Sequence, residues 1–247
     1  MGIPVSAPSL APPKNMRFRL RMHYIRHLLK RAFIIRNGFV LREFGVKSSG
    51  CAYSICADGL GPGSIVYSGG VGKDVSFEHD LVKAFGCSVV IFDPSPIGLA
   101  TMKLAANQNP RFRFFPVGLA GKCGTWRLAP PFTDDGDSWF SHDSPNGTIE
   151  VRCVDLATLM KENQHDHIDL VKIDIEGAEY GVIDQIVDLR IPEGQIIVEF
   201  HDSILPGIRA RQSLRATFKL LNRGYKLISE IGFVDAFVHP KLLNSAR

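Results

Sequence analysis

The clearest indication of the fold class lies in "IDLVKIDIEGAEYGVI", residues 168–183. It opens with a nearly continuous apolar run, which is typical of a strand buried on both faces of a parallel sheet. Three carboxylates follow within six positions, at Asp174, Glu176 and Glu179, and the rest reads as the start of a helix. An acid that ends a buried strand needs a partner. The stretch therefore predicts a strand, a turn that carries polar chemistry, and a helix.

The same order of strand and then helix recurs from residue 64 onward. Apolar runs predict strands at 64–70, 88–93, 111–121, 167–174 and 194–202, and a strand with its helix within 148–162. Helical patterns lie at 74–86, 97–109, 177–187 and 207–222. Two closing strands, 224–232 and 233–240, are expected to pair through Gly232. This alternation predicts an α/β fold, a mostly parallel sheet with helices on both faces.

Residues 129–148 interrupt the alternation with three prolines and two glycines. They predict a long loop, which would be an active-site lid or a disordered insertion. The chain of 247 residues has room for one large domain and holds no apolar run of the ~20 residues that span a bilayer. Its five scattered cysteines form no CxxC pair, so a reducing, cytoplasmic setting is expected.

The N-terminal part differs in composition from the rest. Residues 1–13 hold four prolines and no charge, which predicts a disordered tail. Residues 14–47 carry ten Lys or Arg against the single acid Glu43, a net charge of +9 in a chain of +4. This asymmetry argues against a uniformly basic nucleic-acid binder. Apolar positions spaced by three and four predict an amphipathic helix over 15–36, which would pack on the body or bind an anionic lipid or acidic partner surface.

A glycine turn follows the first predicted strand at Gly69, Gly70 and Gly72, where doubly wound folds bind nucleotides. The dinucleotide pattern GxGxxG fails, because its third glycine would be Val75. In the next helical turns lie Asp74 and Glu78, carboxylates that would repel a pyrophosphate. The turn therefore suits a cofactor that carries an amine.

Asp93 ends the second strand about twenty residues later, the offset at which an acid hydrogen-bonds ribose hydroxyls. It is flanked by Pro94 and Pro96, so a simple turn-forming role is the alternative. A glycine turn without phosphate partners, acids for an amine and an acid for a ribose together match S-adenosylmethionine, which has no phosphate.

These motifs resemble those of the FkbM family of S-adenosylmethionine-dependent methyltransferases over about residues 48–240. In this chain, "YSGGVGKDVSFE" resembles the family's first cofactor motif and "VVIFDPSP" resembles its second. The stretch "IDLVKIDIEGAEYGVI", followed by "QIIVEFH", resembles the family signature. The resemblance implies a class I methyltransferase domain over 48–247, Rossmann-like, with a seven-stranded mostly parallel sheet and an antiparallel C-terminal hairpin. Family members are expected to methylate hydroxyl oxygens of sugars, polyketides or related metabolites.

Site residues carry over by position. The resemblance assigns the methionine portion of the cofactor to Gly70, Gly72, Asp74 and Glu78, and its ribose to Asp93. Class I methyltransferases usually have an acid at the end of the first strand, where this chain has Ser68. Asp74 is therefore expected to take over the cofactor contact of that acid.

Asp174 would lie at the cofactor's methyl group, and Glu199 and His201 end the next strand on the same side. These three are the predicted catalytic residues, with His201 the first choice for the base because its ordinary pKa lies near neutrality. They could instead gather a divalent metal, although no dedicated metal ligand is assigned. Purely structural roles are the alternative for Glu176 and Glu179, and for His201 beside Asp202.

The sequence thus predicts an O-methyltransferase that acts on a small-molecule or glycan acceptor with a hydroxyl and binds no nucleic acid. A nicotinamide-dependent oxidoreductase and a non-catalytic membrane-surface or partner-binding protein are the rival interpretations. The sequence predicts neither the acceptor's identity nor the oligomeric state.

Overall fold

The computed structural model describes residues 16–35, 38–131, 139–141, 149–191, 193–202 and 210–243. The tail predicted over residues 1–13 lies outside these ranges, as does most of the loop predicted over 129–148. Among the described helices, none is both long and apolar enough to span a bilayer.

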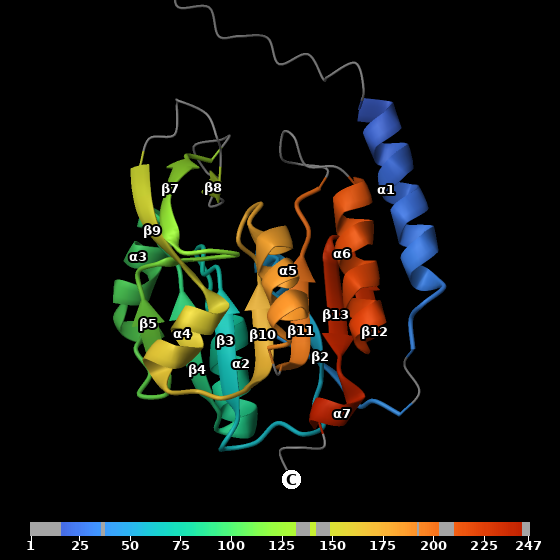
Figure 1. The fold of residues 1–247 in the computed structure, drawn as a ribbon. Coiled ribbons are helices and arrows are strands. Elements are labelled where there is room, and N and C mark those ends of the chain that lie inside the picture. The colour runs from blue at the N-terminus through green and yellow to red at the C-terminus, as the bar shows by residue number, and fades with distance from the viewer. Residues whose placement is uncertain are drawn as a thin grey trace, which may run out of the picture.

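A seven-stranded sheet forms the centre of the molecule (Figure 1). In spatial order its strands are β12 (Lys226–Ile231), β13 (Val234–Val238), β11 (Glu193–Glu199), β10 (Ile168–Ile173), β3 (Ile65–Gly69), β4 (Ser88–Phe92) and β5 (Phe112–Phe115). The five strands from β11 to β5 are parallel. β13 is antiparallel to both β11 and β12. This confirms the predicted fold class, including the hairpin through Gly232, whose φ of +62° suits a glycine turn.

Both faces of the sheet are covered. Consecutive strand residues point to opposite faces, so in β4 Val90 joins one apolar core and Ile91 the other. The first core packs with α4 (Leu156–Asn163), α5 (Glu179–Leu189) and α6 (Ala210–Arg223). The second packs with α2 (Ser76–Phe85), α3 (Pro96–Lys103) and strand β2 (Tyr53–Cys56). Every residue of β10 is buried, which explains its nearly continuous apolar sequence.

A second, smaller sheet was not predicted. Its strands, in order, are β6 (Gly118–Ala120), β9 (Ile149–Asp155), β7 (Gly124–Ala129) and β8 (Phe140–Ser141). The single strand predicted over 111–121 is therefore wrong, because it divides into β5 and β6. Pro116 lies between the two and has no N–H to donate to a sheet. Part of the segment predicted as a loop over 129–148 is strand β8.

The basic segment over 14–47 is only partly helical. Helix α1 covers Met16–Arg31, and β1 (Leu41–Phe44) then pairs antiparallel with β2. The 3-10 turns η1 (Lys47–Ser49) and η2 (Ala105–Asn107) and helix α7 (Pro240–Leu243) complete the described elements. In Figure 1 α1 lies at the outer right of the molecule, beside α6.

Helix α1 is attached to the body by charges. Arg26 and Lys30 are each only 1% exposed. Arg26 Nη1 donates to Asp202 Oδ2 at 2.6 Å, and Lys30 Nζ donates to Asp235 Oδ2 at 2.5 Å. An amphipathic pattern normally places its apolar stripe against the body. Here two buried carboxylates need cationic partners, and that need decides which side of the helix faces inward.

The Lys30–Asp235 pair supports a stability test. Lys30→Ala is expected to lower the free energy of unfolding by about 3–5 kcal/mol, because it leaves Asp235 buried without its ammonium partner. Urea unfolding followed by circular dichroism measures this loss. The matched control, Lys47→Ala, breaks the exposed pair with Glu43 and should cost less than about 1 kcal/mol. Equal small losses in both variants would show that the pair does not anchor α1.

Candidate active site

The turn after β3 lies directly against the end of β10. Gly70 has a φ of +89°, and its N–H donates to the carbonyl of Phe92 at 2.9 Å. The N–H of Asp174 donates to the carbonyl of Gly69 at 3.1 Å. A Cβ at position 70 would collide with the carbonyl oxygen of Asp174. Glycine is therefore required here both by its backbone conformation and by the close approach of two strand ends.

Asp93 is buried at the end of β4 and holds the glycine turn. Its Oδ2 accepts hydrogen bonds from the N–H groups of Val71 at 2.8 Å and Gly72 at 3.2 Å. Its Oδ1 accepts from the N–H of Ser95 at 2.7 Å. The carboxylate thus lies where the sequence places it, beside the turn, but three backbone donors already occupy it. Its contact with a ribose stays a prediction.

Two further acids come from the α2 region. Glu78 is buried and accepts a hydrogen bond from the Ser68 hydroxyl at 2.5 Å. It brings a carboxylate to the end of β3, where Ser68 replaces the acid expected from the resemblance. Asp74 accepts from the Ser49 hydroxyl and from the N–H of Ser76. Burial raises the pKa of Asp74, but these hydrogen bonds outweigh it and hold the pKa below its ordinary value.

Two further residues at this edge, Lys172 and Tyr53, were not predicted from the sequence. Lys172 is buried, donates from Nζ to the carbonyl of Gly70 at 2.7 Å and lies 3.7 Å from Asp174 Oδ2. Burial lowers its pKa, but the charges of Asp174 and Glu78 outweigh burial and raise the pKa above its ordinary value, so the ammonium stays charged. The Tyr53 hydroxyl donates to Asp174 Oδ2 at 3.0 Å. A charge inside an apolar strand could have indicated Lys172; no sequence signal indicates Tyr53.

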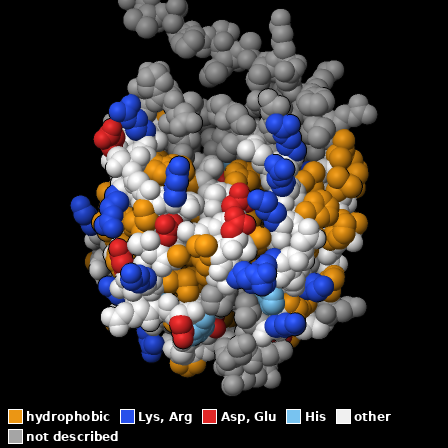
Figure 2. Space-filling model, viewed as in Figure 1, with side chains coloured by type: hydrophobic (Ala, Val, Ile, Leu, Met, Phe, Trp, Pro, Cys, Tyr) orange, Lys and Arg blue, Asp and Glu red, His pale blue; other side chains and the backbone are white. Residues whose placement is uncertain are grey.

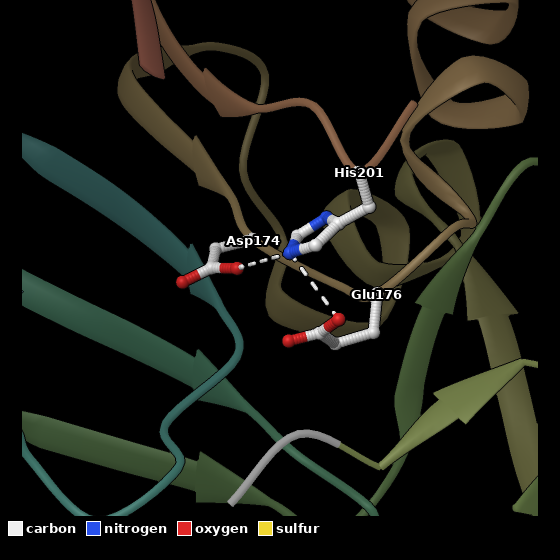
Figure 3. A group of neighbouring side chains, drawn as sticks. All are labelled: Asp174, Glu176 and His201. Carbon is white, nitrogen blue, oxygen red and sulfur yellow. Dashed lines mark ion pairs between the residues drawn. The ribbon is translucent and has the colours of Figure 1, made fainter. Parts of the chain in front are cut away.

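His201 is surrounded by carboxylates. Figure 3 shows its ring directed between Asp174 and Glu176. Its Nε2 lies 3.2 Å from Glu176 Oε2 and 3.8 Å from Asp174 Oδ1. Its Nδ1 lies 2.7 Å from Glu179 Oε1, and Glu179 is fully buried. Glu176 has a φ of +52°, so the turn after β10 bends sharply as it brings this carboxylate to the imidazole.

These neighbours change the charge states expected from the sequence. Burial lowers the pKa of His201, but hydrogen bonds and charges from Glu176 and Glu179 raise it well above its ordinary value. The imidazole is therefore protonated near neutral pH, and the reason for preferring it as the base does not hold. Burial and the charge of Asp174 raise the pKa of Glu199 to about 7, although His201 and Lys172 oppose the shift. Glu199, in place of His201, titrates near neutrality.

The carboxyl ends of β3, β10 and β11 thus assemble an acidic site. Five carboxylates face the two cations Lys172 and His201; they belong to Glu78, Asp174, Glu176, Glu179 and Glu199. Asp174 is central, because it contacts Tyr53, Lys172 and His201. The excess of negative charge fits a cationic ligand and disfavours a phosphate.

A smaller group within this site has the donors of a metal site. One ligand atom from each of Asp174, Glu176 and His201 lies within 4.8 Å of the other two. Carboxylates and an imidazole suit several divalent cations. The imidazole nitrogen that faces away from this group contacts the buried Glu179, as in histidines whose orientation is fixed for metal binding.

Comparison with protein families identifies a methyltransferase domain. The family model described as "Methyltransferase FkbM domain" matches residues 66–227, which include the glycine turn, Asp93, Asp174 and Glu199. A comparison with curated proteins gives no match.

Eleven chains of solved structures match this chain, among them the two that follow. The fibrillarin pre-rRNA processing protein of Methanococcus jannaschii is 10% identical with a TM-score of 0.39, over 72% of this chain and 67% of that chain. The cyclopropane synthase MmaA2 from Mycobacterium tuberculosis is 14% identical with a TM-score of 0.38, over 76% of this chain and 64% of that chain. At such low scores, the fold assignment rests on the sheet order and the family match.

Proposed function

Because this chain belongs to the FkbM family of S-adenosylmethionine-dependent methyltransferases, we propose that it methylates a hydroxyl oxygen of a small-molecule or glycan acceptor at the carboxyl edge of the seven-stranded sheet. The observation that carries the proposal is the acidic site around Asp174, which lies against the glycine turn and contains a carboxylate, Glu199, with a pKa of about 7.

The residues present fit the cofactor. S-adenosylmethionine supplies an electrophilic methyl group on a positively charged sulfonium. The turn at Gly70 and Gly72 would hold its methionine portion, with Asp74 and Glu78 near the amine. Asp93 holds that turn in place and would reach the ribose with its remaining lone pairs. The surplus of carboxylates over cations favours a ligand with positive charge.

The base is better assigned to Glu199 than to His201. An alcohol must lose its proton during methyl transfer, and a base is most effective when its pKa is near the working pH. Glu199 meets this condition, whereas His201 is held protonated by Glu176 and Glu179. As an imidazolium, His201 donates hydrogen bonds and orients the carboxylates around the acceptor. Asp174, held by Tyr53 and Lys172, fixes the position of the reacting groups.

The pH dependence of the reaction tests Glu199. We expect kcat/KM to rise with pH through about 7 and then level off, because only the deprotonated carboxylate accepts the proton. Glu199→Gln should remove this rise and lower kcat/KM about a hundredfold or more. The matched control, Glu150→Gln, alters an exposed acid that pairs with Arg127 and should keep the wild-type profile. A Glu199→Gln enzyme with the wild-type pH profile would remove Glu199 from the base role.

A divalent metal is the second candidate for activating the hydroxyl, favoured by the grouping of Asp174, Glu176 and His201. A metal at these atoms would displace the proton from His201 Nε2 and lower the pKa of a bound hydroxyl. Dialysis against EDTA separates the two mechanisms. Retained activity supports the carboxylate base, whereas loss of activity that Mg²⁺ or Mn²⁺ restores supports the metal.

The acceptor class can be found with a labelled methyl donor. Purified protein is incubated with radiolabelled S-adenosylmethionine and with separate pools of sugars, lipid-linked glycans and polyketides. Release of the label as methanol in mild alkali identifies a methyl ester, and mass spectrometry of the alkali-stable products distinguishes a methyl ether from a methylated nitrogen. Label in ethers that depends on Asp174 supports the proposal, and label found only on nitrogen or in esters overturns O-methylation of a hydroxyl.

A further inference from the structure

The outward face of α1 is apolar. Tyr24 is 63% exposed and Leu28 50%, and Ile25 and Leu29 are also exposed. The spacing of three and four places these side chains on one side of the helix. Phe33 and Ile35 extend the exposed apolar surface beyond the helix end. Large apolar side chains gathered on one face mark an interaction site more often than single exposed ones do.

This face cannot turn inward at low cost. Rotating α1 would separate Arg26 from Asp202 and Lys30 from Asp235, and would leave both carboxylates buried without their partners. Breaking one such pair is strongly destabilising, because it leaves a buried charge without its counter-ion. The orientation of the apolar side chains is therefore set by the buried ion pairs on the opposite side of the helix.

A basic surface adjoins the apolar one. Phe218 of α6 contacts Phe33 edge to face, with ring centroids 5.4 Å apart, so the two helices form one continuous surface. Arg211 and Arg215 are exposed and share a helix face with Phe218, at spacings of four and three. Neither α1 nor α6 contains an acidic residue. Figure 2 shows orange apolar side chains at the right edge of the molecule and blue basic ones next to them.

We propose that this α1–α6 surface docks on an anionic lipid bilayer. Apolar side chains flanked by arginines, without acids, match the requirements for binding in the headgroup region of a charged membrane. A second copy of the chain fits less well, because a symmetric dimer would bring two acid-free basic surfaces together. The docking goes beyond the methyl transfer and does not depend on it.

Co-sedimentation of the full chain with vesicles tests the proposal. The vesicles contain phosphatidylcholine alone or with about a quarter phosphatidylserine. We expect binding to the anionic vesicles at least about tenfold stronger than to the neutral ones, and weaker at high salt, because ions screen the arginines.

Paired variants separate the apolar and the charged contributions. Leu28→Asp/Leu29→Asp should abolish vesicle binding, and Arg211→Glu/Arg215→Glu should abolish the preference for anionic vesicles. The controls change residues outside α1 and α6. They are Leu104→Asp/Leu189→Asp, at leucines 56% and 58% exposed, and Lys103→Glu/Arg111→Glu, at two exposed basic residues. Thermal unfolding verifies that each variant is folded.

Three outcomes would overturn the proposal. The first is absence of binding to either vesicle, which would leave an acidic protein as the partner to seek. The second is a loss of vesicle binding, or of the preference for anionic vesicles, that is as large in the control variants. The third is a wild-type dimer, seen by light scattering, that Leu28→Asp/Leu29→Asp converts to a monomer, because the surface would then join two copies of the chain.

Discussion

Replacing Asp174 by asparagine is expected to lower kcat/KM for methyl transfer by about a thousandfold, within the range for removing a charged group that acts in the transition state. Asparagine keeps the shape of the side chain but removes its negative charge. In the wild type, the Asp174 carboxylate faces Lys172 and His201 and accepts a hydrogen bond from the Tyr53 hydroxyl. Steady-state kinetics with a labelled methyl donor measures the loss.

A control separates this effect from that of removing a carboxylate outside the site. Asp184→Asn removes a carboxylate on α5 that is half exposed and pairs with Lys219, and it should leave kcat/KM within about twofold of wild type, as is usual for surface changes. Thermal unfolding of both variants verifies folding. If Asp174→Asn retains near wild-type kcat/KM, the reacting groups lie elsewhere.

The second large effect is expected at the glycine turn. Gly70→Ala should weaken cofactor binding at least about a hundredfold and lower the free energy of unfolding by several kcal/mol, because a side chain there meets both an unfavourable φ and the backbone of Asp174. Calorimetric titration with S-adenosylhomocysteine and urea unfolding measure the two losses.

The hairpin glycine provides the matched control. Gly232 also has a positive φ, but a Cβ there would have open space around it. Gly232→Ala should therefore cost only the backbone strain, about 1–2 kcal/mol, and leave cofactor binding unchanged. Similar results for the two variants would mean that the contact between the turn and β10 has no special role.

The seven-stranded sheet could be predicted because its central strands are buried on both faces. Such strands leave nearly continuous apolar runs, as in β10, and the helices between them keep a regular spacing. The second sheet left no such signal. Half of the residues of β7 are exposed, and β8 has only two residues. Neither strand therefore has a continuous apolar run in the sequence.

The meeting of Gly70, Asp93 and Asp174 at one edge followed from the parallel sheet alone, since the carboxyl ends of parallel strands point the same way. The partners of these residues could not be predicted. Tyr53 reaches Asp174 from a separate two-stranded sheet, and Glu78 reaches Ser68 from a helix. Such contacts depend on packing between distant segments, which the spacing of residues in the sequence does not record.

The charge states were equally hidden. His201 was the first choice for the base on its ordinary pKa, but three surrounding carboxylates stabilise its protonated form. Burial also raises the pKa of Glu199, to about 7, so this carboxyl titrates near neutrality in place of the imidazole. The same limitation applies to α1. Its amphipathic pattern predicted a helix, but its orientation depends on Asp202 and Asp235, which lie about two hundred positions away in the chain.

We propose that the carboxyl edge of the sheet is an acid-lined site for a positively charged, phosphate-free methyl donor. Isothermal titration of the purified protein with S-adenosylmethionine and, in parallel, with NADH distinguishes this site from a dinucleotide site. We expect saturable one-site binding of S-adenosylmethionine, weakened in Asp93→Ala, and no heat from NADH. Binding of NADH without binding of S-adenosylmethionine would show that the site is not one for a methyl donor.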